Sequence, residues 1–158
     1  MLIRPTYTQR QYWLTILTAG FIIGILSSAV YFLFYWFLYV QQSYVFSITY
    51  LMPLLGSTLG LFFFKQRYVW DDFPYIKAFT MAFLIGLISD IFFSSFLYIA
   101  YTYVIEPRID LFENIDNEIL QRYMSPQAVS LSMFLINITL SFIYSLIIAI
   151  FAKRKIQE

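Results

Sequence analysis

The hydrophobic pattern divides the chain into four long apolar segments separated by short polar ones. Positions 11–64 contain no charged residue. That stretch is too long for one helix and suits two, since a membrane-spanning helix needs about 20 apolar residues. The polar triplet QQS at 41–43 marks the break, and polar segments at 65–77 and 106–126 bound the later spans. The pattern predicts helices over residues about 12–40, 44–64, 78–105 and 127–152.

Composition places these helices in a membrane. Hydrophobic residues make up 61% of the 158 residues and charged residues 12%, about half the charged fraction of a soluble domain. We therefore predict an all-α polytopic membrane protein in which residues 1–158 form a single four-helix transmembrane domain. The chain has no cysteine and no histidine, which removes thiolate chemistry and the commonest general base and metal ligand. We expect no cofactor, no metal and, at a net charge of +1, no nucleic-acid partner.

The distribution of basic residues predicts the orientation. Only Arg108 and Arg122 fall on the side of the third polar segment. The opposite side, which carries both termini and the segment 65–77, has eight basic residues: Arg4, Arg10, Lys65, Arg67, Lys77, Lys153, Arg154 and Lys155. Because basic residues stay in the cytoplasm, both termini are expected there and residues 106–126 outside.

The outer segment has the pattern of a short amphipathic helix. Asp110, Glu113 and Asp116 lie toward one side of a helix drawn through it, and Phe112, Ile115, Ile119 and Tyr123 follow helical spacing on the other. We expect this helix to lie on the outer membrane surface between the third and fourth spans. Its carboxylates are read as a solvated face rather than a cation site.

Small residues recur every four positions on three spans, and so share a helix face. The positions are Gly20, Gly24 and Ser28 on the first, Gly56 and Gly60 on the second, and Gly86 on the third. Such faces let two helix backbones approach closely in lipid. The sequence leaves open whether the partner helix belongs to the same chain. Pro53, inside the second span, is expected to kink it.

One carboxylate, Asp90, lies near the middle of the third span. The four-residue step through it reads Ala82, Gly86, Asp90 and Ser94, and the same step on the fourth span reads Asn137, Ser141, Ser145 and Ala149. Because the two spans are consecutive and antiparallel, we expect these stripes to face each other. Asp90 should then hydrogen-bond Asn137, with Ser94 and Ser141 nearby.

Three interpretations of Asp90 stay open. A carboxylate at the bilayer centre costs about 2.5 kcal/mol or more, and removal from water favours the neutral acid. Asp90 could therefore be a protonated hydrogen-bonding link between helices, a proton- or cation-coupled site, or a contact for a basic residue of a partner. Asp71 and Asp72 are adjacent carboxylates, but we read Asp72 as the cap of the third helix, with Pro74 in its first turn.

Residues 74–155 resemble a known family. "PYIKAF" opens the third span, "YVIEPRI" closes it, and "MSP" and "SLIIAIFAKRK" bound the fourth. These features are similar to the small bacterial membrane proteins grouped as domain of unknown function 4199. In that family an acidic residue and proline follow the third of four helices, as Glu106-Pro107 does here, and the tail is basic, as at residues 153–155. The outer segment is shorter than the family's usual Met-rich helix, and Asp90 matches no family pattern. The resemblance implies an inner-membrane protein of a Gram-negative bacterium, often encoded near glycosyltransferases that act on lipid-linked sugars.

These observations give three functional hypotheses. The first is a non-enzymatic accessory or scaffolding subunit of an inner-membrane complex, whose partner could be a lipid-linked-sugar glycosyltransferase. The second is a small proton-coupled transporter that works as a homodimer through Asp90. The third is an enzyme that acts at the membrane surface through Asp71, Asp72 or the outer carboxylates, which nothing in their spacing requires. The expected partners are the lipid bilayer and another integral membrane protein or a second copy of the chain.

Overall fold

The computed structural model describes residues 7–36, 47–69, 73–105 and 123–152. These residues form four long helices and no strand, so the predicted all-α class is confirmed. The helices are α1 (Gln9–Trp36), α3 (Met52–Tyr68), α4 (Tyr75–Tyr103) and α6 (Pro126–Ala152). All four helical segments are long and apolar enough to cross a membrane, and the second of them begins at Ser47, before α3 itself.

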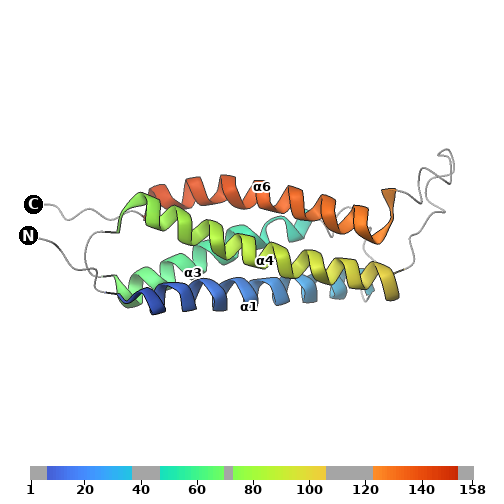
Figure 1. Ribbon diagram of the computed structural model, residues 1–158, viewed down its shortest axis with the longest axis horizontal. Coiled ribbons are helices and arrows are strands. Elements are labelled where there is room, and N and C mark those ends of the chain that lie inside the picture. The colour runs from blue at the N-terminus through green and yellow to red at the C-terminus, as the bar shows by residue number, and fades with distance from the viewer. Residues whose placement is uncertain (1–6, 37–46, 70–72, 106–122, 153–158) are drawn as a thin grey trace, which may run out of the picture.

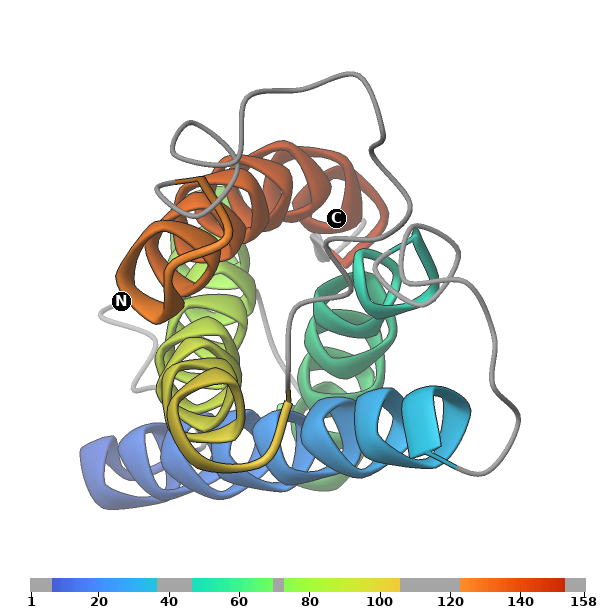
Figure 2. The ribbon, with the colours of Figure 1, turned by 90° about the vertical axis from the view of Figure 1, so that its right-hand side faces the viewer.

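The helices form a bundle in which α4 contacts all three others (Figure 1). Its most extensive contact is with α6, and α3 also contacts α1 and α6. By contrast, α1 and α6 lie on opposite sides of the bundle (Figure 2). The start of α1 and the end of α6 lie at the same end of the molecule (Figure 1), as an even number of spans requires.

The described part of the bundle buries apolar and small polar side chains together, and it exposes many large apolar side chains on its outside. Its exposed residues include Leu59 and Phe151, which are 65% and 72% accessible. Its buried polar residues are Ser27, Thr49, Ser57, Ser89, Asp90, Ser94, Asn137, Ser141 and Ser145. Lipid tails accept apolar surface, and small polar residues pack and hydrogen-bond between helices in a bilayer. This distribution is typical of a membrane protein, in agreement with the four span-length apolar helices.

The starts of α1, α4 and α6 differ in how their free N–H groups are capped. Thr8 and Gln11 form a reciprocal capping box, in which each backbone N–H donates to the other's side chain. Ser125 accepts a hydrogen bond from the N–H of Ala128, and Pro126 takes the first position of α6. At α4 the cap position is Pro74, with no side-chain hydrogen bond. The prediction that Asp72 is the cap residue is therefore wrong in position, and Asp72 itself lies outside the described residues.

Pro53 lies at an interruption in the second helical segment, Ser47–Tyr68. The chain forms a helical turn at residues 47–49, leaves it at Tyr50 and Leu51, and enters α3 at Met52. Pro53 then lies in the first turn, where its missing N–H breaks no helical hydrogen bond. The expected continuous helix over 44–64 is thus interrupted, and α3 extends farther, to Tyr68.

The small-residue faces pack against helices of the same chain. A Cβ atom built on Gly20 or Gly24 of α1 would lie 2.7 Å from a side chain of α4, and one on Gly56 would lie 2.5 Å from Ile23 of α1. Gly60 meets Ala19 and Ile85, and Ser28 hydrogen-bonds the carbonyl of Gly24 in its own helix. The glycines therefore let α1, α3 and α4 approach one another closely.

Candidate functional site

Asp90 lies at the α4–α6 interface, on the stripe of small and polar residues that the sequence indicates. All four residues of the α4 stripe and all four of the α6 stripe are buried. Apolar side chains on the other faces of both helices are exposed. The predicted apposition of the two stripes is what the structure has. We call Asp90, Ser94, Asn137 and Ser141 the Asp90 cluster.

The hydrogen-bond partner of Asp90 is Ser141. The Ser141 hydroxyl donates to Asp90 Oδ2 over 2.8 Å, and both residues are at most 1% exposed. The expected bond between Asp90 and Asn137 is not formed in the described part of the chain, where Asn137 Oδ1 has no hydrogen-bond partner. Ser141 lies beside Asp90 because α6 packs with Ser141 directly over Gly86, and Gly86 is one turn before Asp90 on α4.

Close helix contact fixes this arrangement. A Cβ on Gly86 would lie 2.6 Å from Ser141 Oγ, so only glycine leaves room for the serine here. From the third side, the Ser57 hydroxyl of α3 donates to the carbonyl of Ala82 over 2.8 Å. Ser145 donates to the carbonyl of Ser141 over 2.6 Å. Asp90 is thus held by Ser141 of α6, and hydroxyls of α3 and α6 bond to the backbone of the same small-residue stripes.

Two oxygens of the cluster have unused hydrogen-bonding capacity. Asn137 Oδ1 and Ser94 Oγ are buried, and neither has a hydrogen-bond partner among the residues described. A buried polar atom without a partner costs about 1–3 kcal/mol. An amide oxygen accepts, and a serine hydroxyl can accept or donate. The cluster can therefore hold a proton on the Asp90 carboxyl or receive a further hydrogen-bonding group.

A shallow groove on the outside of α4 and α6 reaches this cluster at Ser94. Its volume is about 370 Å³, and it is lined by Ser94, Ser95, Tyr98, Ile99, Ser130, Leu131 and Phe134. The hydroxyls of Ser95 and Ser130 donate to carbonyls of their own helices. The sequence analysis missed this groove. Its signal is the run of Ser94, Ser95 and Tyr98, which continues the polar stripe onto the membrane-facing side.

The carboxylate-rich candidates of the sequence are Asp71, Asp72 and the outer segment. Asp71, Asp72 and the outer segment 106–122 lie outside the described residues, and Tyr123, at the end of that segment, is 74% exposed. In the ranges that are described, no three Asp, Glu, His or Cys side chains group to hold a metal ion. The Asp90 cluster offers one carboxylate with serine and amide oxygens, a set that suits a proton or a weakly bound cation.

Comparison with known proteins gives no relative for this chain. No family model matches it, no curated protein matches it, and no solved structure matches it. The resemblance to domain of unknown function 4199 stays a prediction. Function has to be inferred from the placement of the residues themselves.

Proposed function

We propose that this protein is a non-enzymatic accessory subunit of a bacterial inner-membrane complex, and that a helix of its partner occupies the groove on α4 and α6. The groove is the observation that supports this proposal. The small-residue faces of α1 and α3 are occupied by helices of the same chain, and Asp90 is 1% exposed. A partner therefore meets the membrane-facing surface rather than Gly20, Gly24 or Asp90.

The chemistry of the groove favours a helix over lipid tails. Its lining carries four hydroxyl-bearing residues, Ser94, Ser95, Tyr98 and Ser130, in a region otherwise covered by large apolar side chains. The hydroxyls of Ser95 and Ser130 already donate to their own helices, and lipid tails offer no donor to their oxygens. A polar group on a partner helix does, and each interhelical bond contributes about 0.6 kcal/mol in a bilayer. The small side chains of Ser94, Ser95 and Ser130 also let a partner helix pack closely against the groove.

The test fills the groove without touching the bundle interior. Ser95→Leu and Ser130→Leu should abolish co-purification of the partner in mild detergent, while the bundle keeps its helical content. Thr139→Leu is the matched control, because Thr139 is also exposed on α6, also donates to its own helix, and lies outside the groove. Retention of the same partner by all three variants, at wild-type stoichiometry, would exclude the groove as its site.

Orientation belongs to the same proposal. We infer that the end of the bundle with both termini is cytoplasmic and that residues 106–126 are periplasmic, because eight of the ten basic residues belong to the first side. The chain has no cysteine, so single cysteines can be introduced at the termini or at residues 106–126. An impermeant maleimide should label only the latter in intact spheroplasts, and labelling of the termini would reverse the orientation.

A second candidate is a small proton-coupled transporter acting as a homodimer through Asp90. The buried carboxyl beside two oxygens without partners favours it, since intramembrane carboxylates commonly mark proton pathways. Asp90→Asn keeps the size of the side chain and removes the titrating group. In proteoliposomes with a pH gradient and ethidium as the probe cation, wild-type protein should drive uptake that Asp90→Asn abolishes. Equal uptake by the two proteins would exclude this function.

A further inference from the structure

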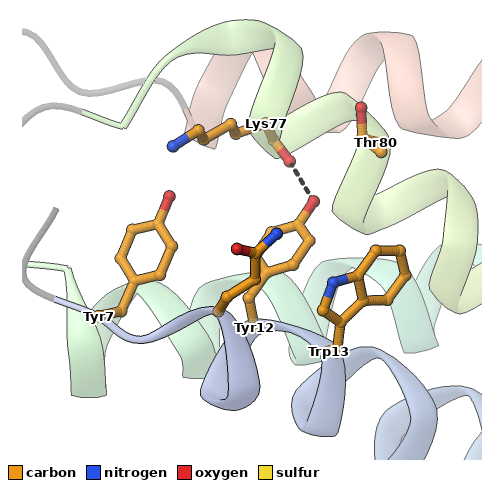
Figure 3. Close-up of a pocket in the computed structure, with 6 residues that line it drawn as sticks. Tyr7, Tyr12, Trp13, Lys77 and Thr80 are labelled. Atoms are coloured by element: carbon orange, nitrogen blue, oxygen red, sulfur yellow. Dashed lines mark hydrogen bonds between the residues drawn. The ribbon is translucent and has the colours of Figure 1, made fainter.

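A pocket lies at the end of the bundle that holds both termini, far from the Asp90 cluster. It has a volume of about 320 Å³ and is formed between the start of α1 and the first turns of α4 (Figure 3). Its lining consists of Tyr7, Gln9, Tyr12, Trp13, Lys77 and Thr80. Neither the accessory-subunit proposal nor the transporter candidate uses these residues.

The aromatic wall of the pocket is held in place by ring packing. The Tyr7 ring lies edge-on to Phe64, with centroids 5.1 Å apart, and stacks on Tyr12 at 6.2 Å. The Tyr12 hydroxyl donates to the backbone carbonyl of Lys77 over 3.2 Å, which ties α1 to α4 across the pocket. These contacts therefore hold the shape of the pocket without a bound ligand.

Two polar groups of the pocket, the Lys77 ammonium and the Tyr7 hydroxyl, can donate to a ligand, whereas the hydroxyls of Tyr12 and Thr80 already donate to backbone carbonyls. The Lys77 ammonium lies 5.5 Å from the centre of the Tyr7 ring. The Tyr7 hydroxyl is buried and has no hydrogen-bond partner within the described ranges. Figure 3 shows this hydroxyl and the Lys77 ammonium extending toward each other from opposite sides. A charged donor and a free hydroxyl that converge in this way suit an anionic oxygen.

The helix ends beside the pocket add to the positive potential. Both α1 and α4 begin at this end of the bundle, and helix N-termini carry partial positive charge. The cap position of α4 is Pro74, which offers no side-chain hydrogen bond to the first N–H groups of the helix. Lys77 lies in that first turn of α4, which places its charge and the helix end together.

We propose that this pocket binds a phosphate group, held by the Lys77 ammonium and the Tyr7 hydroxyl. Trp13 is 47% exposed at the rim, and tryptophan favours the boundary between lipid tails and headgroups. A phosphate entering there is carried by the headgroup of an anionic phospholipid or comes free from solution. Both sources present the same oxygens to Lys77 and Tyr7, and the experiment separates them.

The test is calorimetric titration of the purified full-length protein in mild detergent. The probes are short-chain phosphatidylglycerol, the matched diacylglycerol without phosphate, and inorganic phosphate. We expect wild-type protein to bind the phosphatidylglycerol and not the diacylglycerol. Lys77→Gln should weaken binding about tenfold, since a hydrogen bond to a charged group is about twice as strong as a neutral one. Tyr7→Phe, which removes only the hydroxyl, should weaken it about threefold.

Arg67→Gln is the matched control. Arg67 is a cation at the same end of the bundle, stacked on the rings of Phe63 and Tyr68 and outside the pocket, so this variant should bind like the wild type. If inorganic phosphate binds with the same dependence on Lys77, the site binds free phosphate. If inorganic phosphate does not bind while phosphatidylglycerol does, the site binds a lipid headgroup. Equal binding of phosphatidylglycerol and diacylglycerol, or equal losses in Lys77→Gln and Arg67→Gln, would overturn the proposal.

Discussion

Replacing Gly86 with alanine tests the α4–α6 contact that positions Asp90. The added methyl would lie 2.6 Å from Ser141 Oγ and 2.8 Å from Ser141 Cβ. Carbon atoms in contact are about 3.5–4.0 Å apart, so the two helices would have to separate by about 0.7 Å or more. Ser141 cannot simply rotate away, because its hydroxyl is bonded to Asp90 and its Cβ is fixed by the backbone.

The magnitude follows from three contributions. Overpacking of a filled interface costs about 1–3 kcal/mol. Weakening of the bond to Asp90 adds about 0.6 kcal/mol, and alanine gains back about 0.9 kcal/mol over glycine within a helix. We therefore expect Gly86→Ala to lower the free energy of unfolding by about 0.7–2.7 kcal/mol. Gly86→Ala combined with Ser141→Gly removes the clash and should recover part of this loss.

The assay is unfolding of the purified protein in mixed micelles by added dodecyl sulfate, followed by circular dichroism. Gly60→Ala is the control, because its methyl would meet the mobile end of Ile85 at 2.9 Å and the Ala19 methyl at 3.0 Å. This variant should lose less stability than Gly86→Ala. A Gly86→Ala protein as stable as the wild type would refute the close contact between α4 and α6.

Three further predictions follow from the packing. Tyr31→Phe removes the 3.0 Å bond between the hydroxyls of Tyr31 and Tyr101 and should cost about 0.6 kcal/mol in the same dodecyl sulfate assay; no change would mean that the bond is absent in the membrane. Pro53→Ala should change stability by less than about 1 kcal/mol, since proline is tolerated in a first turn; a loss of about 3 kcal/mol would instead place it in a helix interior. Thr8→Ala should speed amide exchange in the first turn of α1, whose capping box it breaks, and unchanged exchange would argue against that cap.

The buried stripes could be predicted from the sequence because of their contrast with their surroundings. Small and polar residues repeat at a four-residue step in two otherwise large and apolar segments: Gly86, Asp90 and Ser94 in one, and Asn137, Ser141 and Ser145 in the other. In lipid such a face must turn inward, whatever the details of packing. That inference identified the helices, the interface and the residues around the acid.

The partner of Asp90 could not be predicted, because it depends on a shift along the helix axis. Asn137 and Ser141 are four residues apart, about 6 Å along the helix axis. Which of them lies beside Asp90 is decided by how α6 settles against α4, and the fit of Ser141 over Gly86 decides it. No pattern within either helix carries that information.

The break before α3 and the terminal pocket were also beyond the sequence. A proline in an apolar run is compatible with a kink or with a new helix start, since membrane helices tolerate both, and Pro53 makes the start. The pocket joins Tyr7 to Lys77 of α4, residues that are far apart along the chain and whose approach depends on the tertiary fold. Neither the break before α3 nor the pocket has a sequence motif that would predict it.

The most direct test of the account is a disulfide between positions 90 and 141 in the native membrane. Because the chain contains no cysteine, Asp90→Cys with Ser141→Cys leaves only one possible pair, and the side chains they replace are in contact. Oxidation should give an internal disulfide within one chain. The control pair, Asp90→Cys with Phe142→Cys, should not form one, because Phe142 is 47% exposed on the outside of α6. Equal disulfide formation by both pairs, or disulfides only between two copies of the chain, would contradict the burial of Asp90 between α4 and α6.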